Sequence, residues 1–243
     1  MSSRPPVTRG RPPVTKGPSR APTIVAVVSV LLVAVVVIGG VLYFRSRPSG
    51  PLQTGPVAAT YGTTVQNGVI VAGTGPRVID VYEDALCPAC RQFETTYSER
   101  ITAALNAGRV TVRYHMVNLL EDSSSPPGYS TAGGAALICA AENNAFPSLH
   151  QALYAQQPAE GGPGFTPDQL VDAGRQAGAA PGYEPCVRST KYAAAVGANY
   201  RQAAGSPALL QTVQGRTGFA TPTVVLDGRR VDSTAPELQA ALA

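Results

Sequence analysis

VIDVYEDALCPACRQFETTYSE, residues 78–99, joins an apolar run to a helical pattern through a CPAC motif. The run predicts a strand and the pattern after Pro88 predicts a helix, so the strand delivers Cys87 to the start of that helix. Unpaired backbone N–H groups and the positive end of the helix dipole stabilise a thiolate at this position. Cys90 follows three residues later, within reach of a disulfide with Cys87. A strand, a CxxC motif and a helix in this order predict a dithiol redox centre.

Two other interpretations of the motif are half of a zinc site and an inert structural pair. A zinc site needs a second cysteine pair or a histidine pair at short spacing. The remaining cysteines, Cys139 and Cys186, lie far apart in helical contexts, and the two histidines, His115 and His150, are isolated in the sequence. The spacings therefore favour redox chemistry, with no metal or other cofactor, and His115 is expected to pack in a strand.

An uncharged apolar segment, residues 24–44, predicts a transmembrane helix. At 1.5 Å per residue it measures about 31 Å, which is enough to span the core of a bilayer. Five basic residues precede the segment and two follow it, so the positive-inside rule places the N-terminus in the cytoplasm. A cleaved signal peptide is the alternative, but its apolar core would be shorter and no small-x-small cleavage site follows Phe44. We expect an uncleaved, single-pass anchor in the cell membrane, with the domain outside the cytoplasm.

Composition divides the rest of the chain into three parts. Residues 1–23, rich in Arg and Pro, are expected to form a disordered basic cytoplasmic tail. Residues 45–59, rich in Pro, Gly and Ser, predict a flexible linker. Residues 60–243 are expected to form one domain, which is long enough to bury a core.

The distribution of charge argues against a nucleic-acid partner. Residues 1–50 carry seven basic groups and no acid, so the other 193 residues hold twelve basic groups against fifteen acidic ones. A nucleic-acid interface needs basic groups clustered on the folded part of the chain, and here they are scattered.

Hydrophobic patterns predict the order of elements. Strands are expected at 64–66, 69–72, 77–82, 109–120, 223–226 and 229–231. Helices are expected at 90–107, near 130–144, 147–157, 167–178, 184–203 and 207–214, and from Pro236 onward. The first helix and its two flanking strands form a βαβ unit. Asn67-Gly68 and Asp227-Gly228 predict the turns of two β-hairpins.

Three segments, YEDALCPACRQFE (82–94), YHMVNLL (114–120) and GFATPTVVLDG (218–228), extend with a helical insertion over nearly the whole domain. In these residues the chain resembles the DsbA-like thioredoxin-fold thiol:disulfide oxidoreductases, of the membrane-anchored kind found in high-GC Gram-positive bacteria. Ala220 stands where that family usually has Gly. The resemblance implies an α/β thioredoxin fold with an inserted helical subdomain at about 129–215, here preceded by a single transmembrane helix.

Thr221 and Pro222 precede the strand expected at 223–226. By sequence alone, a proline before a strand is usually a trans residue at the strand entry. The resemblance implies instead that Pro222 is a cis-proline opposite the CxxC motif, where the preceding backbone pairs with an extended substrate chain.

Cys139 and Cys186 fall in two of the expected helices. A disulfide between them would close a loop of about 48 residues and constrain the unfolded chain by about 4 kcal/mol. The alternative is two buried free thiols that pack as small apolar groups. The even number of cysteines and the exported location favour a structural disulfide.

Glu83 and Asp84 precede Cys87 by four and three residues. Thioredoxin-like families often place a buried acid six residues before the first cysteine, but Val81 occupies that position here and Asp80 lies on the opposite face of the strand. Glu83 shares the face of Val81 and is therefore the candidate for proton transfer.

The resemblance implies an extracytoplasmic thiol:disulfide oxidoreductase that introduces disulfides into exported proteins. The partners that it implies are reduced exported proteins and a quinone-coupled membrane reoxidase, of the DsbB type or the vitamin K epoxide reductase-like type. A membrane-anchored reductant or isomerase, for example for cytochrome c maturation, and a non-enzymatic anchored binding module are the alternatives. The intact CxxC motif argues against a pure binder, and the helical insertion, which the family's reductants usually lack, favours the oxidase.

Overall fold

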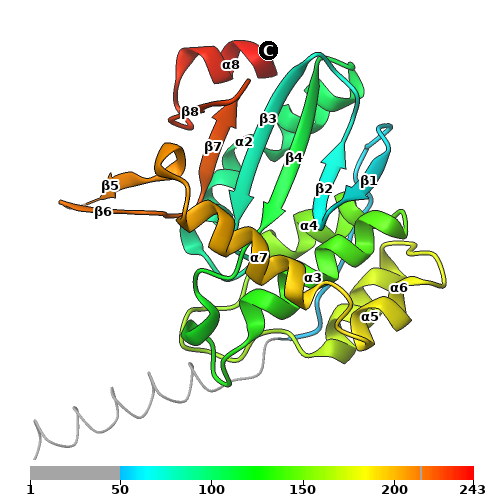
Figure 1. Cartoon of the computed structure of the whole chain (residues 1–243). Coiled ribbons are helices and arrows are strands. Elements are labelled where there is room, and N and C mark those ends of the chain that lie inside the picture. Colours follow the sequence, from blue (N-terminus) through cyan, green and yellow to red (C-terminus); the bar gives the residue numbers. More distant parts are fainter. Residues whose placement is uncertain (1–49, 214) are drawn as a thin grey trace, which may run out of the picture. The chain divides into compact units, whose positions relative to one another are not determined.

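The computed structural model describes residues 50–213 and 215–243, and its centre is a six-stranded sheet with the order β1-β2-β4-β3-β7-β8 (Figure 1). The strands are β1 (Thr63–Gln66), β2 (Val69–Ala72), β3 (Arg77–Glu83), β4 (Val110–Met116), β7 (Thr223–Leu226) and β8 (Arg229–Val231). β3 and β4 are parallel and every other pair is antiparallel. The two predicted hairpins, β1–β2 and β7–β8, are confirmed, and their turns hold Asn67 and Asp227 at positive φ.

The βαβ unit places the CxxC motif at the end of a central strand. β3 is buried at its middle on both faces of the sheet, and α2 (Pro88–Asn106) connects it to β4 and covers the sheet. Pro88 fits the first helical turn because its missing N–H would have no partner there. The helix ends before Gly108, whose φ of +66° suits glycine. α8 (Pro236–Leu242) packs against α2 at its C-terminal side.

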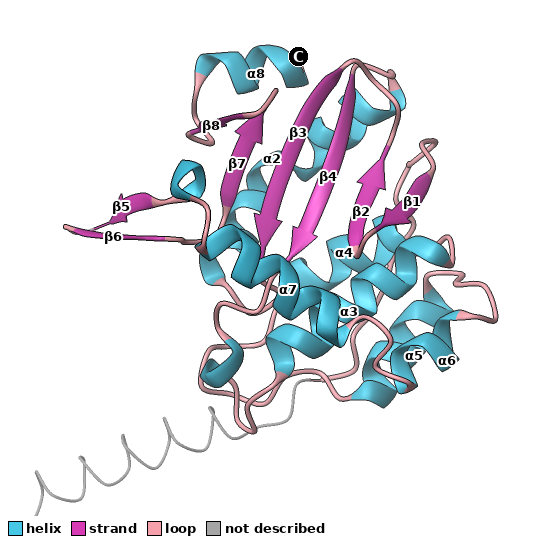
Figure 2. Ribbon diagram, in the orientation of Figure 1, coloured by secondary structure: helices cyan, strands magenta, loops and turns pink. Residues whose placement is uncertain are grey.

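The helical insertion is built around α3 (Tyr129–Glu142), whose side chains are almost all buried. The other helices are α4 (Phe146–Ala155), α5 (Pro167–Gln176), α6 (Tyr183–Arg188) and α7 (Ala193–Ala204), which Figure 2 shows gathered at one end of the sheet. Gly133 lets α3 approach the loop before the CxxC motif, because a Cβ there would lie 2.8 Å from the Cβ of Ala85. The insertion therefore packs directly on residues 84–86, the redox loop that joins β3 to the CxxC motif.

Two predicted helices differ in the structure. The helix expected over 184–203 is two helices, α6 and α7, because the chain turns at 189–192 with Thr190 at φ +53°. The prediction of a helix over 207–214 is wrong. A short 3₁₀ turn, Pro207–Leu209, leads into a small hairpin of β5 (Gln211–Val213) and β6 (Arg216–Gly218), which projects from the body in Figure 1. β-Branched residues and the positive φ of Gly215 favour this hairpin over a helix.

The segment before β1 is part of the domain. Leu52 keeps only 1% of its surface exposed, and the side chain of Gln156 both donates to and accepts from the backbone of Gln53, at 2.6 and 3.0 Å. Thr54 Oγ1 donates to the carbonyl of Ala173. The prediction of a flexible linker over 45–59 is therefore wrong for residues 50–59, because an apolar side chain within the polar segment finds a place in the core.

The predicted basic tail (1–23), the predicted transmembrane helix (24–44) and residues 45–49 lie outside the described residues. Within 50–213 and 215–243, none of the helices is both long enough and apolar enough to cross a bilayer.

Replacing Leu52 with alanine is expected to lower the free energy of unfolding by about 3 kcal/mol, the usual cost of truncating a fully buried leucine. Urea denaturation followed by circular dichroism measures the change. Gln53→Ala is the matched control, because it leaves both backbone hydrogen bonds of residue 53 in place. Equal stability of the Leu52→Ala protein and the wild type would contradict the assignment of this segment to the core.

Candidate active site

Cys87 is the N-cap residue of α2 and Cys90 lies in its first turn. Both cysteines are free thiols in the structure. Cys90 is fully buried, whereas Cys87 keeps 7% of its surface exposed. Of the two sulfur atoms, that of Cys87 is therefore the one that a thiolate from outside could reach.

The surroundings separate the two thiols in acidity. The Cys90 side chain hydrogen-bonds to Cys87 and, with Thr221 and the backbone N–H groups of Cys90 and Ala89, lowers the pKa of Cys87 to about 6 against the effect of burial. Burial, followed by the neighbouring Cys87, raises the pKa of Cys90 well above its usual value. Near neutral pH the pair thus holds one thiolate, on Cys87, and one proton, on Cys90.

Thr221 and Pro222 lie beside the cysteines. Their peptide bond is cis, and the Cys87 sulfur lies 3.5 Å from the Thr221 carbonyl oxygen. A groove of about 730 Å³ begins here and runs between α2 and the β7–β8 hairpin, with Ala89 and Phe93 on its helical side. Thr221 Oγ1 is buried and has no hydrogen-bond partner among the described residues. The groove can therefore take an extended chain next to Cys87.

Asp84 holds the loop before the motif. Its carboxylate accepts hydrogen bonds from the backbone N–H groups of Leu86 and Leu120, both at 2.8 Å, and from the Ser130 hydroxyl at 2.7 Å. These donors occupy the carboxylate and tie β3, the chain after β4 and α3 together. Asp84 is therefore a positioning residue rather than a group that is free to exchange a proton with the cysteines.

Glu83, the sequence candidate for proton transfer, is fully buried at the end of β3. Burial, with a smaller contribution from Cys87, raises the pKa of its carboxyl group to about 7. Its Oε2 lies 3.0 Å from His150 Nε2. A carboxyl group that titrates near neutrality beside a dithiol is suited to general acid–base catalysis.

Two residues of this site, Glu94 and His150, are absent from the sequence-based prediction. Glu94 of α2 is buried, and its Oε2 lies 3.7 Å from His150 Nδ1. The helical spacing could have found Glu94, since positions 90 and 94 share a face of α2. No sequence signal leads to His150, because α4 of the insertion brings it to β3 from 67 residues away.

The donor set of Glu83, Glu94 and His150 is one that a cation such as Zn²⁺ could accept, and one atom from each lies within 4.8 Å of the others. The imidazole, however, directs a different ring nitrogen to each carboxylate. That arrangement suits proton exchange along the ring better than convergence on one ion.

His115 and Asp80 lie outside the site. His115 Nε2 contacts the Asp80 carboxylate at 2.8 Å and its ring stacks on Tyr82. Arg113 forms a salt bridge with the same carboxylate. His115 and Asp80 therefore belong to the packing of β3 against β4. Val81, on the other face of β3, is fully buried.

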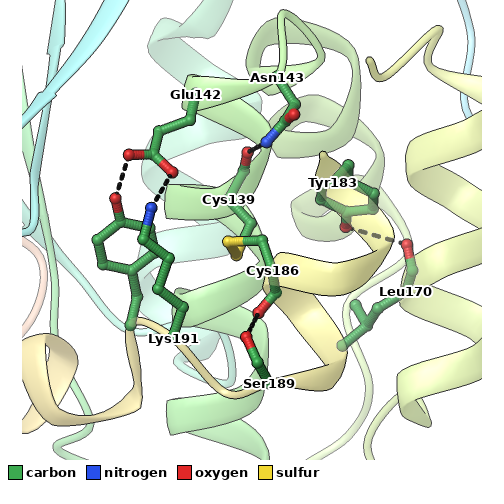
Figure 3. Close-up of a disulfide and its surroundings, with 9 residues drawn as sticks. Cys139, Glu142, Asn143, Leu170, Tyr183, Cys186, Ser189 and Lys191 are labelled. Carbon is green, nitrogen blue, oxygen red and sulfur yellow. Dashed lines mark hydrogen bonds and ion pairs between the residues drawn. A yellow bond between two sulfur atoms is a disulfide. The ribbon is translucent and has the colours of Figure 1, made fainter. Parts of the chain in front are cut away.

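A disulfide joins Cys139 of α3 to Cys186 of α6, with the two Cα atoms 5.8 Å apart (Figure 3). The Asn143 amide donates to the Cys139 carbonyl and the Ser189 hydroxyl to the Cys186 carbonyl, which fixes the backbone on both sides of the bond. The disulfide staples two helices of the insertion, and neither cysteine belongs to α2.

Comparisons with known proteins show which families the chain is similar to. A family model described as Thioredoxin matches residues 66–243. The structure of oxidised DsbA from Mycobacterium tuberculosis is 30% identical, with a TM-score of 0.58, and the match covers 80% of this chain and 88% of that one. The reduced disulfide bond oxidoreductase DsbG of the same organism is 28% identical over the same shares of the two chains, with a TM-score of 0.57.

A solved structure of lower sequence identity agrees in fold. MdbA, a thiol-disulfide oxidoreductase from Corynebacterium diphtheriae, is 21% identical, with a TM-score of 0.60 over 76% of this chain and 95% of that one. The serine/threonine-protein kinase PknE of M. tuberculosis is 31% identical over 155 residues, which are 59% of this chain and 27% of the kinase. The chain thus spans about a quarter of the length of the curated relatives that it matches.

Proposed function

The chain belongs to the thioredoxin family and is a DsbA-like thiol:disulfide oxidoreductase, and from that premise we propose that it is an oxidase, which introduces disulfides into exported proteins. The observation that carries the proposal is the position of Cys87 at the N-cap of α2 with Cys90 beside it, an arrangement that lowers the pKa of Cys87 and raises that of Cys90. A stabilised thiolate stabilises the reduced enzyme, and a stable reduced form makes the disulfide form a stronger oxidant.

The proposed reaction starts from the Cys87–Cys90 disulfide. A substrate thiolate attacks the Cys87 sulfur, the bond between the cysteines breaks, and Cys90 leaves as a thiolate that takes up a proton. A second substrate thiolate then attacks the substrate sulfur of the mixed disulfide and displaces Cys87 as a thiolate. The substrate gains a disulfide and the enzyme gains two electrons, with one proton on Cys90.

Substrate is proposed to lie in the groove between α2 and the β7–β8 hairpin. An extended chain there could pair with the backbone before Pro222, while its cysteine approaches the exposed edge of Cys87. We propose reduced exported proteins as the substrates. A quinone-coupled membrane protein, of the DsbB type or the vitamin K epoxide reductase-like type, is proposed to return the enzyme to its disulfide form.

The redox potential tests the direction of the reaction. The dipeptide between the cysteines, Pro88-Ala89, carries no charge, and Glu83 lies close to Cys87. We expect a potential between about −120 mV and about −270 mV, nearer to the oxidising end, and an alkylation rate of Cys87 that rises with pH through about 6. Equilibration with glutathione buffers measures the potential. A value more reducing than that of thioredoxin would favour the alternative, a membrane-anchored reductant.

Ala89→His is expected to shift the potential toward the oxidising end and to lower the pKa of Cys87 further, because an imidazolium beside Cys87 stabilises its thiolate. Ala89→Gln is the control for side-chain size without charge. An unchanged potential in Ala89→His would contradict the electrostatic argument.

We also propose an extracytoplasmic location, with the domain held at the cell membrane by residues 24–44. The uncharged run and its basic N-terminal flank support this orientation. Protease added to spheroplasts is expected to digest the domain while a cytoplasmic marker survives. Survival of the domain until lysis would contradict the orientation.

A further inference from the structure

Two separate hollows flank helix α2. The substrate groove is lined by residues 89, 92, 93, 96 and 97 of the helix, whereas a cavity of about 370 Å³ is lined by residues 94, 98, 99, 102, 103 and 106. The two sets share no residue, and at 3.6 residues per turn their centres lie more than about 100° apart around the helix axis. The cavity therefore lies on the side of the helix that a substrate in the groove leaves uncovered.

The segment from Pro56 to Tyr61 forms a wall of this cavity, and Glu94 and His150 lie on its inner side. The volume is large enough for several water molecules, each of which occupies about 30 Å³ in the liquid. The cavity therefore brings solvent to the two buried residues of the site that face away from the groove.

Glu83, His150 and Glu94 connect the cysteines to the cavity. His150 lies between the two carboxyl groups, with Nε2 3.0 Å from Glu83 and Nδ1 3.7 Å from Glu94. The second oxygen of each carboxyl group is buried without a hydrogen-bond partner among the described residues. Neither carboxyl group forms a salt bridge with Arg or Lys within the described part of the chain, so the pair holds a proton instead of two negative charges.

Among the described residues, five further titratable groups face this cluster, namely Cys87, Cys90, Tyr61, Tyr114 and Tyr154. Burial raises the pKa of all three tyrosines, so they remain neutral near pH 7, and burial lowers the pKa of His150, which is then neutral as well. Cys90 is the group at the inner end that must change protonation in the proposed reaction.

We propose that Cys90 exchanges its proton with solvent through Glu83, His150 and Glu94, by way of the cavity beneath residues 56–61. The proposal rests on the proposed redox function and deepens it. When Cys90 leaves as a thiolate, Glu83 gives it a proton. Glu94 then takes a proton from water in the cavity and passes it to Nδ1 of the imidazole, which passes its Nε2 proton to Glu83. In the reverse direction the same groups carry the proton outward.

Proton exchange through the cavity can continue while substrate covers Cys87 on the groove side of α2.

The reaction of the reduced full chain with oxidised glutathione isolates the step in which Cys90 changes its protonation. Cys87 first forms a mixed disulfide in a bimolecular reaction, and Cys90 then loses its proton and displaces glutathione. At high glutathione disulfide the observed rate reaches a plateau, which reports the step of Cys90.

His150→Gln is expected to lower the plateau about 100-fold, the lower end of the effect of a positioned acid or base, and to leave the bimolecular step unchanged. His115→Gln is the matched control, because it removes the other histidine of the chain and should change neither step. In His150→Ala, added imidazole is expected to enter the cavity and to restore the plateau in proportion to its concentration.

A wild-type plateau in folded His150→Gln would overturn the proposal, and so would the absence of imidazole rescue. Stoichiometric zinc in the purified wild type would also overturn it, because the metal would occupy the ring nitrogen. If both His150 variants fail to fold, Glu94→Gln provides the test, with a slow plateau expected and a normal plateau contradicting the route. A reducing potential of the wild type would defeat the oxidase role alone, since the plateau is measured independently of physiological direction.

Discussion

Replacing Cys87 with serine is expected to abolish oxidase activity, with a loss of about 10⁴-fold or more, as for other enzymes that lose their nucleophile. Cys87 is the more exposed cysteine of the pair, and its pKa, about 6, suits it to be both the electrophilic target and the leaving group. The measurement is the rate at which the oxidised protein forms disulfides in a reduced two-cysteine peptide.

Cys90→Ser is the companion variant. It keeps Cys87 but removes the buried partner, so the oxidised form cannot be made and Cys87 is expected to collect mixed disulfides with substrates. Mass spectrometry under non-reducing conditions detects these adducts. Appreciable oxidase activity in Cys87→Ser, or adducts on Cys90 in that variant, would contradict the assignment of the two roles.

Removing the second pair of cysteines, in Cys139→Ala/Cys186→Ala, is expected to lower the free energy of unfolding by about 4 kcal/mol. The disulfide spans 47 residues of sequence and joins two helices of the insertion, so its loss releases a long loop in the unfolded chain. Urea denaturation measures the effect. The redox potential of Cys87–Cys90 should stay unchanged, because neither removed residue belongs to α2.

Thiol titration separates the two bonds. The oxidised, denatured protein is expected to contain no free thiol. Mild reduction should release two thiols first, from Cys87 and Cys90, because the acidic Cys87 is the better leaving group. Two unreactive free thiols in the oxidised protein, or equal stability of the double variant, would count against a structural bond.

Local signals explain which parts of the fold were predictable. The helix after Pro88 and the hairpins at Asn67 and Asp227 follow from residues that restrict their own backbone, and the structure has them nearly where expected. The prediction of one long helix over 184–203 was wrong because the spacing of apolar residues does not reveal that the chain reverses at Thr190. The place of Leu52 in the core depends on contacts more than 100 residues away, which the composition of its own segment conceals.

Some residues of the active site could likewise be predicted from local sequence, and others could not. The positions of Cys87 and Cys90 at a helix start follow from adjacent residues. The cluster around Glu83 required Glu94 from the next turns of α2 and His150 from the insertion, and an isolated histidine in a sequence carries no sign of its partners. Periodicity could reach the first of these two residues, whereas only the tertiary fold supplies the second.

Asp84 has a mechanical consequence. One buried carboxylate joins the redox loop, the chain after β4 and the first turn of α3 through charge-assisted hydrogen bonds. Separating the insertion from the sheet would leave this carboxylate unpaired in the interior, which costs several times more than an ordinary hydrogen bond. The insertion and the sheet are therefore expected to move as one body, without hinge closure over bound protein. The residues that line a preformed groove, and the flexibility of the substrate proteins themselves, then determine which substrates bind.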